Sequence, residues 1–515
     1  MKRLFAVALG ILTAIGGFVD IGDIVANTET GARYGMSLAW VVVVGVIGIC
    51  LFAEMAGRVA TVSKRATFDL VRERLGARVA LVNLVASFFI TFLTLAAEIG
   101  GVALAIELAT SVNYLLWVPI VALCVWLVVW RVKFHLMENA FGLLGLALVV
   151  TAVALWRLGP DWGGLLHGAT HPAVPQGEGH PSWWYFAIAL LGAAMTPYEV
   201  FFFSSGAVEE GWSRADLATN RLNVYVGFPL GGLLSLSLMA GATLFLEPRG
   251  ILPGHLSQVA LPTALVLGKL GLAVLLVGFF AATFGAALET GLSCGYSIAQ
   301  YFGFQWGKFV RPADAPRFHL VTLVSIVLGA GLVLTTVDPI TVAEYSIVLS
   351  AAALPLTYFP ILVVANDPDY MGDKVNSWLT NASGRSTCSC CWWWRGDDPA
   401  DGPDQGGELT AVAGRVLEAG LHLLDRQLVD RDGRLAGKVD DLEIEFPSGG
   451  GPPLVTAVLA GPGALGRRIG GPLGAALEAA ADRLRGGEHR PARVSFAVVK
   501  RIGSAVELSV PRAEL

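Results

Sequence analysis

The sequence contains few charged residues. Of its 515 residues, 15% are Asp, Glu, Lys or Arg and 54% are hydrophobic, whereas an ordinary soluble domain has about 25% charged residues. This shortage excludes a disordered chain and disfavours a soluble enzyme. The six cysteines have no regular spacing that would predict a disulfide framework. The net charge of −5 gives no sign of nucleic-acid binding. The composition therefore favours a polytopic membrane protein.

Long apolar runs occupy the first 365 residues. They are roughly 20 residues long, which is the length that crosses a bilayer as a helix. The eighth run is longer, and we expect it to extend beyond the membrane. No small-residue cleavage site follows the first run, which predicts a retained anchor and not a removed signal peptide. The predicted spans are 4–28, 37–59, 79–109, 112–130, 134–158, 183–206, 222–246, 264–300, 318–337 and 341–365.

Basic residues are concentrated in alternate loops, after the second, fourth, sixth and eighth runs. They are Arg58, Lys64, Arg65, Arg72, Arg74, Arg78, Arg131, Lys133, Arg214, Arg221, Lys308, Arg311 and Arg317. The opposite loops 159–182 and 338–340 have no Lys or Arg. Cytoplasmic loops carry an excess of Lys and Arg. We therefore expect a multi-pass protein in the lipid bilayer of the cell membrane, with its N-terminus and, after ten spans, its C-terminus in the cytoplasm.

Two of the runs are interrupted by acidic residues beside helix-breaking residues. In the first run, Gly16 and Gly17 precede Asp20 and Asp23, and glycine is a poor helix former. The sixth run contains Thr196-Pro197-Tyr198-Glu199, in which the proline removes a helix hydrogen bond. A carboxylate inside a bilayer is costly and is a functional candidate by default.

Interrupted helices at corresponding places in two halves of five spans predict an inverted-repeat transporter, with its substrate at the unwound stretches. Each interruption alone is more often structural, so the matched placement carries this interpretation. Hard oxygen donors with strong negative charge suit a divalent cation such as Mg²⁺. The predicted metal ligands are Asp20, Asp23, Thr196, Glu199 and the freed backbone carbonyls of Gly17 and Ala193.

Further residues are candidates for the permeation path or for coupling. Tyr198 would line the path, and Glu98 lies deep in the long third run. Met195 is the only sulfur near the sixth-run interruption, and whether it faces the site is left open. Most of the remaining acids in or near the runs are expected at a membrane interface or a polar cavity. These are Glu54, Glu107, Glu138, Glu289 and Glu344.

The residues of the first interruption also resemble a known motif. Phe18–Gly35, FVDIGDIVANTETGARYG, resembles the first-span signature of the NRAMP divalent-metal transporters, which is D-P-G-N and then a stretch ending in G-A-x-Y-G. The sixth run resembles the family's M-P-H motif with its following serine pair, and Val364–Val375 resembles the end of its tenth span. The resemblance covers residues 1–380. It implies an all-α polytopic membrane protein with a LeuT-like 5+5 inverted repeat and broken first and sixth helices.

Departures from the family pattern suggest a branch. The family's Asn, Met and His become Asp23, Thr196 and Tyr198. Leu95 stands where the third-span acid would be, with Glu98 one turn further on. This pattern is similar to the NRAMP-related Mg²⁺ transporters. It implies uptake of Mg²⁺, and also Mn²⁺, by alternating access without proton coupling, with no cofactor and no enzymatic activity.

Other functions remain open at this stage. A proton-coupled Mn²⁺/Fe²⁺ transporter of the same family is the nearest alternative. An organic-cation or amino-acid carrier could use the same fold, although the crowded acids disfavour an anionic substrate. A membrane-anchored scaffold for the C-terminal region would transport nothing.

The C-terminal residues 409–515 have the pattern of a small soluble β-rich domain. Short strand-like runs are expected at 438–446, 453–461, 493–500 and 505–510, with an amphipathic helix at 472–485. The segment Leu424–Glu443 resembles a PRC-barrel, which implies a small β-barrel that binds an unknown regulatory partner. Two acid pairs could hold a cation, although turn and edge roles are favoured for them. The pairs are Asp430 with Asp432, and Asp440 with Asp441.

The linker 381–408 fits neither part of the chain. Cys388, Cys390 and Cys391 lack a fourth ligand at a usual spacing, which disfavours zinc. With suitable codons, Cys388–Trp394 and Asp397–Glu408 read in other frames become apolar. We therefore raise the hypothesis of a frame-shifted eleventh span that fused a transporter to a separate PRC-barrel protein. A genuine eleventh span would place the C-terminus outside.

Overall fold

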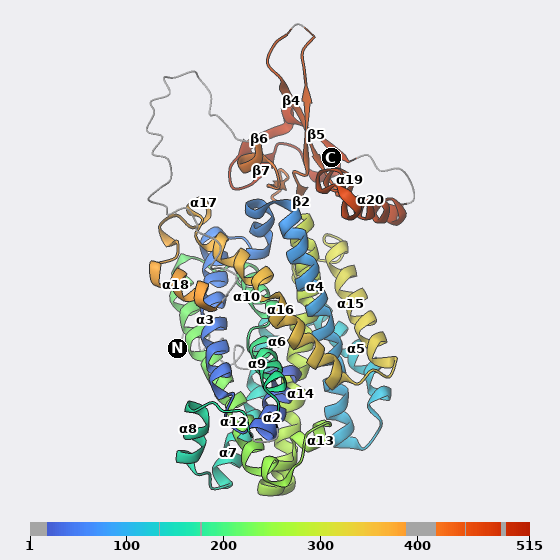
Figure 1. The fold of residues 1–515 in the computed structure, drawn as a ribbon. Coiled ribbons are helices and arrows are strands. Elements are labelled where there is room, and N and C mark those ends of the chain that lie inside the picture. Colours follow the sequence, from blue (N-terminus) through green and yellow to red (C-terminus); the bar gives the residue numbers. More distant parts are fainter. Residues whose placement is uncertain (1–17, 133, 176–177, 388–418, 449, 486–490) are drawn as a thin grey trace.

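The computed structural model describes the chain except residues 1–17, 133, 176–177, 388–418, 449 and 486–490 (Figure 1). Gly17, the start of the first predicted span and the proposed frame-shifted stretches lie outside the described residues. The helical periodicity of Leu409–Leu424 also predicts a helix at the start of the C-terminal part, and most of it, residues 409–418, lies outside the described residues.

A bundle of long helices forms the larger part of the structure (Figure 1). Within the described residues, nine helical segments are long and apolar enough to cross a membrane. They match the second to tenth predicted spans, and the first predicted span continues into α2. The main helices are α2 (Ile21–Tyr34), α3 (Ala39–Ser63), α4 (Thr67–Thr110), α5 (Tyr114–Arg131), α6 (Phe134–Gly145), α7 (Val149–Arg157), α9 (His180–Ala194), α10 (Pro197–Glu209), α11 (Leu217–Leu222), η3 (Asn223–Gly227), α12 (Phe228–Phe245), α14 (Leu261–Phe302), α15 (Pro316–Leu334) and α16 (Pro339–Ala365).

Helices α4 and α14 pack along each other and form the centre of the bundle, with α16 and α15 against α4. Each of these two long helices bends at one glycine with positive φ, Gly76 (78°) in α4 and Gly268 (66°) in α14. Glycine adopts this conformation without the strain that a Cβ would cause. Each bend separates a short first part of its helix from a much longer remainder.

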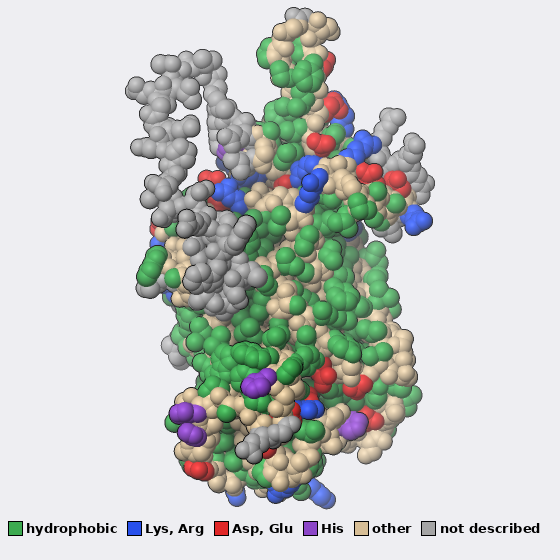
Figure 2. All heavy atoms as spheres, in the orientation of Figure 1, with side chains coloured by type: hydrophobic (Ala, Val, Ile, Leu, Met, Phe, Trp, Pro, Cys, Tyr) green, Lys and Arg blue, Asp and Glu red, His purple; other side chains and the backbone are tan. Residues whose placement is uncertain are grey.

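Shorter helices close the two ends of the bundle. They are α8 (Trp162–Thr170), α13 (Leu256–Val259), α17 (Pro368–Met371) and α18 (Trp378–Thr387). Figure 2 shows hydrophobic side chains covering the middle of the bundle, whereas Lys, Arg, Asp and Glu lie at its two ends, many of them at the end that carries the strands. Leu270 and Leu116 remain 77% and 66% exposed on this outer surface. This distribution is the one expected of a bundle surrounded by lipid.

The C-terminal region is a small domain of two sheets at one end of the bundle (Figure 1). One sheet has the order β2-β1-β7-β6, with β1 and β7 parallel, and the other has the order β3-β4-β5. Three of the four predicted strand runs and the predicted helix are confirmed to within a few residues. The fourth run, 493–500, is wrong as a single strand, because it divides into β5 and β6, which belong to different sheets. Strands β1 and β2 were not predicted. The elements are β1 (Gln427–Val429), β2 (Leu435–Lys438), β3 (Asp441–Glu445), β4 (Leu454–Ala460), α19 (Pro462–Ile469), α20 (Gly471–Arg485), β5 (Ala492–Ser495), β6 (Val499–Ile502) and β7 (Val506–Leu508).

The acid pairs of this domain have structural roles. Asp430 accepts hydrogen bonds from the backbone N–H groups of Asp432, Arg434 and Arg512, at 2.8–2.9 Å. Asp440 accepts from the N–H of Gly461 and forms an ion pair with a bundle arginine. Asp430 therefore has the turn role that the sequence favoured over a cation site. Asp440 is only 3% exposed, so its expected place at a solvated edge is wrong, because Arg72 packs against it from the bundle.

Candidate metal site at two helix breaks

The first predicted break is confirmed at Asp20. The backbone there is extended (φ −101°, ψ 179°), and α2 begins at the next residue. Asp20 Oδ1 accepts a hydrogen bond from the N–H of Asp23 at 2.8 Å. This contact caps α2, because the first N–H groups of a helix have no partner within the helix. One of the two predicted acids therefore also holds the helix start.

The second predicted break is confirmed at Met195 and Thr196, which join α9 to α10. Met195 (φ −127°, ψ 63°) and Thr196 (φ −77°, ψ 131°) are both outside the helical region. Pro197 begins α10, the helix position where proline fits best. Because Pro197 has no N–H, the carbonyl of Ala193 loses the donor that a continuous helix would provide.

Side chains connect the two breaks inside the bundle. The hydroxyl of Tyr198, on α10, donates to Asp20 Oδ2 at 3.2 Å. Within the second break and the start of α10, Thr196 Oγ1 donates a hydrogen bond to Glu199 Oε2 at 3.3 Å. All four residues are at most 6% exposed. Tyr198 therefore lies between the acids that the sequence placed on separate spans.

Asp23 is held by residues from two helices. It accepts from Asn27 Nδ2 at 2.8 Å and from the hydroxyl of Ser235, which lies on α12. Asn27 is four residues after Asp23, a helical spacing that could have identified this contact. Ser235 was missed, because a serine in an apolar run carries no signal of what it contacts.

Glu98 connects the central helix α4 to the start of α2. Its Oε1 accepts from the N–H of Ile21 at 3.0 Å, and the residue is 0% exposed. Its other oxygen, Oε2, is buried without a hydrogen-bond partner among the described residues, and the same holds for Glu199 Oε1. The buried acids thus present two carboxylate oxygens that the described protein groups do not satisfy.

Glu289 is a further buried acid beside the breaks. It lies on α14, is 8% exposed, and interacts electrostatically with Asp20, Glu199 and Tyr198. From the sequence it was expected, with most of the other acids in or near the runs, at an interface or a polar cavity. Nothing in one helix's sequence shows that its acid faces those of two other helices.

The backbone of the second break is held by α16. Ser350 Oγ donates to the carbonyl of Met195 at 3.4 Å, and the hydroxyl of Tyr358 donates to that of Thr196 at 3.3 Å. Both donors are buried, and sequence reasoning missed both. Two carbonyls freed by the break therefore receive hydrogen bonds from a neighbouring helix.

Across the described residues, no three His, Cys, Asp or Glu side chains form a ready-made metal-binding group. Hydroxyl, amide and backbone donors occupy oxygens of Asp20 and Asp23. A cation entering this region would exchange places with such donors and would meet the unpartnered oxygens of Glu98 and Glu199. Whether the predicted ligands act together therefore stays a prediction.

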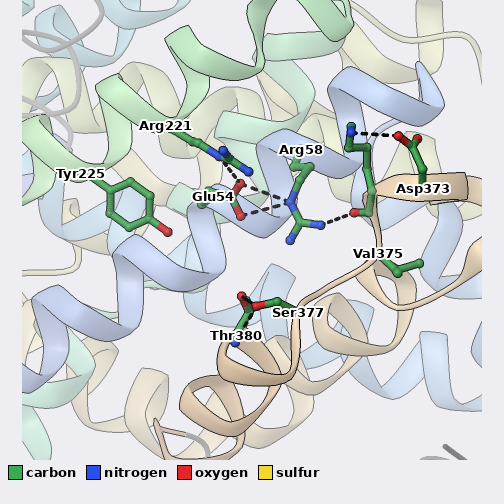
Figure 3. Close-up of a pocket in the computed structure, with 9 residues that line it drawn as sticks. Glu54, Arg58, Arg221, Tyr225, Asp373, Val375, Ser377 and Thr380 are labelled. Atoms are coloured by element: carbon green, nitrogen blue, oxygen red, sulfur yellow. Dashed lines mark hydrogen bonds and ion pairs between the residues drawn. The ribbon is translucent and has the colours of Figure 1, made fainter. Parts of the chain in front are cut away.

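A separate cavity of about 430 Å³ lies among α3, α11 and the segment that follows α16 (Figure 3). Glu54 and Arg58 on α3 form an ion pair at 3.2 Å, and Arg221 contacts the same carboxylate at 3.4 Å. Arg58 also donates to the Lys374 carbonyl, beyond α16. Glu54 thus faces a polar cavity, as expected, and its charge is matched by arginines, unlike the acids at the breaks.

Comparisons with known proteins place these features in a family. Residues 10–392 match the family described as natural resistance-associated macrophage protein-like. The divalent metal cation transporter MntH of Aeromonas hydrophila is 24% identical over 375 residues, which cover 72% of this chain and 89% of that protein.

Solved structures agree in fold. A manganese transporter of Eremococcus coleocola superposes with a TM-score of 0.55 at 18% identity, covering 74% of this chain and 83% of the other. MhsT, in complex with L-phenylalanine, superposes with a TM-score of 0.51 at 18% identity, covering 74% and 94%. The LeuT-like helical fold predicted from the sequence is confirmed, with a small sheet region at the C-terminus. The chain belongs to the natural resistance-associated macrophage protein-like (Nramp) family.

Proposed function

We propose that this protein transports divalent metal cations by alternating access, with Mg²⁺ and also Mn²⁺ as substrates. The observation that carries the proposal is the buried cluster of acids at two helix breaks, in which Tyr198 connects Asp20 to the second break. Substrates of inverted-repeat transporters bind at such breaks. The relatives that are named as divalent metal cation or manganese transporters support the same substrate class.

The donor chemistry favours hard cations. Mg²⁺ is bound through one or two carboxylates and keeps several waters, whereas a thioether would favour softer metals. Thr196 provides a hydroxyl in this position of the motif, and it contacts Glu199. An inside-negative potential contributes about 2.3 kcal/mol per charge per 100 mV. That contribution draws a dication inward without a coupled proton.

We assign two sets of residues in this proposal. The residues that would bind the cation are Asp20, Asp23, Thr196, Glu199 and the carbonyls of Gly17 and Ala193. The residues that would line its path are Tyr198, Glu98 and Met195.

Cation influx into proteoliposomes tests the proposal. Mg²⁺, Mn²⁺ and Ca²⁺ uptake by the purified protein is measured with an inside-negative potential. We expect Mg²⁺ and Mn²⁺ to enter, and Asp20→Asn or Glu199→Gln to lower the rate at least about tenfold by removing a charged ligand. Glu445→Gln, at an exposed position of β3, is the matched control and leaves uptake unchanged. Wild-type rates in both site variants would refute the assignment.

The same vesicles separate the alternatives. Acidification of the lumen in step with metal entry would replace the uncoupled mechanism by the proton-coupled Mn²⁺/Fe²⁺ alternative. Uptake of an amino acid or organic cation without metal uptake would indicate a carrier of another class. A protein that moves neither would be a scaffold for its C-terminal domain.

We further infer that the protein lies in the cell membrane with both termini in the cytoplasm. The basic loop predicted to be cytoplasmic after the second span supports this orientation, since its Arg65, Arg72 and Arg78 contact the domain. The PRC-barrel assignment of that domain and its regulatory partner remain predictions from the sequence resemblance.

A further inference from the structure

The C-terminal domain rests on the ends of the two central helices. It contacts the first turns of α4, the last residues of α14 and the segment that follows α14 (Figure 1). We call this part of the bundle the docking surface and define it by Asp69, Arg72, Glu73, Tyr301 and Gly303. The same two helices carry Glu98 and Glu289 near the helix breaks.

Acids of α4 receive a base from the domain. Lys438 Nζ, on β2, lies 2.8 Å from Asp69 Oδ1 and 3.6 Å from Glu73 Oε1. The side chains of Lys438 and Glu73 are both 0% exposed. Glu73 Oε1 also accepts from the backbone N–H of Gln427, on β1, at 3.1 Å. A lysine is almost never fully buried unless it is paired in this way.

Arg72, a basic residue of α4, is paired with acidic residues of the domain. Arg72, 1% exposed, forms an ion pair with Asp425 at 2.7 Å and a second one with Asp440. Its third donor group reaches the carbonyl of Tyr301, on α14, at 3.0 Å. Each side of the boundary therefore supplies both acidic and basic residues to ion pairs with the other side. Arg72 also connects α4 to α14 through its hydrogen bond to Tyr301.

The end of α14 bonds to the domain through backbone groups. The N–H of Gly437 and the side-chain amide of Gln427 both donate to the carbonyl of Gly303, each at 3.1 Å. The N–H of Leu435 donates to Gln305 Oε1 at 3.0 Å. Strand β2 is thus hydrogen-bonded to the carbonyl end of α14 as well as to β1.

Burial of this many charges distinguishes the boundary from an accidental contact. A buried ion pair costs desolvation energy that only good geometry and additional hydrogen bonds offset. Lys438 and Arg72 have both, whereas the rim pair of Arg434 with Asp314 is 3.8 Å long and largely exposed. A boundary of this kind needs both partners in place, because removing either one leaves a buried charge unpaired.

We propose that the docking surface recognises the C-terminal domain as a self-standing module, which stays bound without a covalent link, and that docking braces α4 against α14 during transport. The recognition needs no peptide between the two parts, because the contacts above provide it. The brace follows from Arg72 and Gln427, which contact both helices. Docking does not depend on the proposed function, whereas the effect on transport does.

The test uses the full chain with a protease recognition site inserted after Gly396. After cleavage in detergent, we expect the two fragments to elute together on gel filtration. In Lys438→Glu and in Arg72→Glu, which place like charges together, we expect affinity to fall at least about a hundredfold and the small fragment to elute alone. Arg434→Ala at the exposed rim and Arg493→Ala within the domain are controls that stay bound.

The outcomes decide both parts of the proposal. Separation of the wild-type fragments, or co-elution of both charge variants, would overturn recognition. A circular-dichroism spectrum of strands in the released fragment shows that loss of binding is not loss of folding, and Lys438→Met, which adds no repulsion, repeats the test. For the brace, we expect metal uptake to fall at least about fivefold on undocking. Unchanged uptake in an undocked protein that still loses transport with Asp20→Asn would overturn the brace alone.

Discussion

Glu98 acts at the residue scale through one hydrogen bond across two helices. Its Oε1 receives the first N–H of α2 beside Asp20. We expect Glu98→Gln, which keeps an acceptor oxygen, to change the free energy of unfolding by less than about 1 kcal/mol. Glu98→Leu leaves the N–H of Ile21 buried and unpaired, at a cost of about 1–3 kcal/mol. Thermal unfolding of the solubilised protein measures both.

Metal uptake by the same two variants separates position from charge at Glu98. If the residue only holds α2, Glu98→Gln transports within a few-fold of the wild-type rate. Equal stability of the Gln and Leu variants would contradict the anchoring role. Glu445→Leu is the control for loss of an exposed acid.

Asp430 makes the C-terminal domain sensitive to acid. Although burial raises its pKa, the backbone N–H groups of Arg434, Arg512 and Asp432 outweigh that effect and hold the pKa below its ordinary value of 3.8. A lowered folded-state pKa contributes stability that is present above that ordinary value and is lost as pH falls through the folded pKa. We therefore expect Asp430→Asn to destabilise the domain relative to wild type at pH 7. Below about pH 4 the difference in stability between the two proteins should disappear, because the carboxylate of the wild type is then protonated.

Hydrogen exchange of residues 427–440, corrected for intrinsic rates, measures the Asp430 effect. The protection lost in Asp430→Asn should shrink between pH 7 and pH 3. A constant difference over that range would show that the carboxylate charge is not what the turn uses.

At the element scale, Pro197 keeps α9 and α10 apart. Proline disfavours a helix interior by about 3 kcal/mol relative to alanine. Pro197→Ala returns a donor for the Ala193 carbonyl and favours one continuous helix. We expect metal uptake to fall at least about tenfold while the protein still folds. Pro119→Ala, at an exposed position within α5, is the matched control with unchanged uptake. Wild-type transport by Pro197→Ala would show that the break does not depend on the proline.

At the scale of the whole molecule, Arg65, Arg72 and Arg78, which follow the second span, contact the C-terminal domain at one end of the bundle. We expect an epitope inserted at Gly450, in the β3–β4 turn, to bind antibody only after cells are permeabilised. An epitope in residues 172–175, in a loop predicted to be external, should be reached in intact cells. The reverse result at Gly450 would support an eleventh span and an external domain.

Much of the site could be predicted, because membrane burial makes a few residues conspicuous. Asp20 and Glu199 stand out in apolar runs, and Pro197 marks its own helix break. Ser350 and Tyr358, which hold the freed carbonyls, carry no comparable signal, since each is an ordinary residue on another helix. Their roles depend on distance in space and not on separation along the chain.

The docking surface likewise combines features that the sequence predicts with contacts that only the tertiary structure reveals. The sequence was enough to determine the helical spans, the two breaks and several strands of the C-terminal domain, because hydropathy, proline and glycine act over a few neighbouring residues. It placed Arg72 among the cytoplasmic charges and Asp440 at a solvated edge. Only the tertiary structure joined these two residues, 368 positions apart, as a buried pair. The physical reason is that a charge's surroundings, solvent or a partner, are set by which distant segments pack against it.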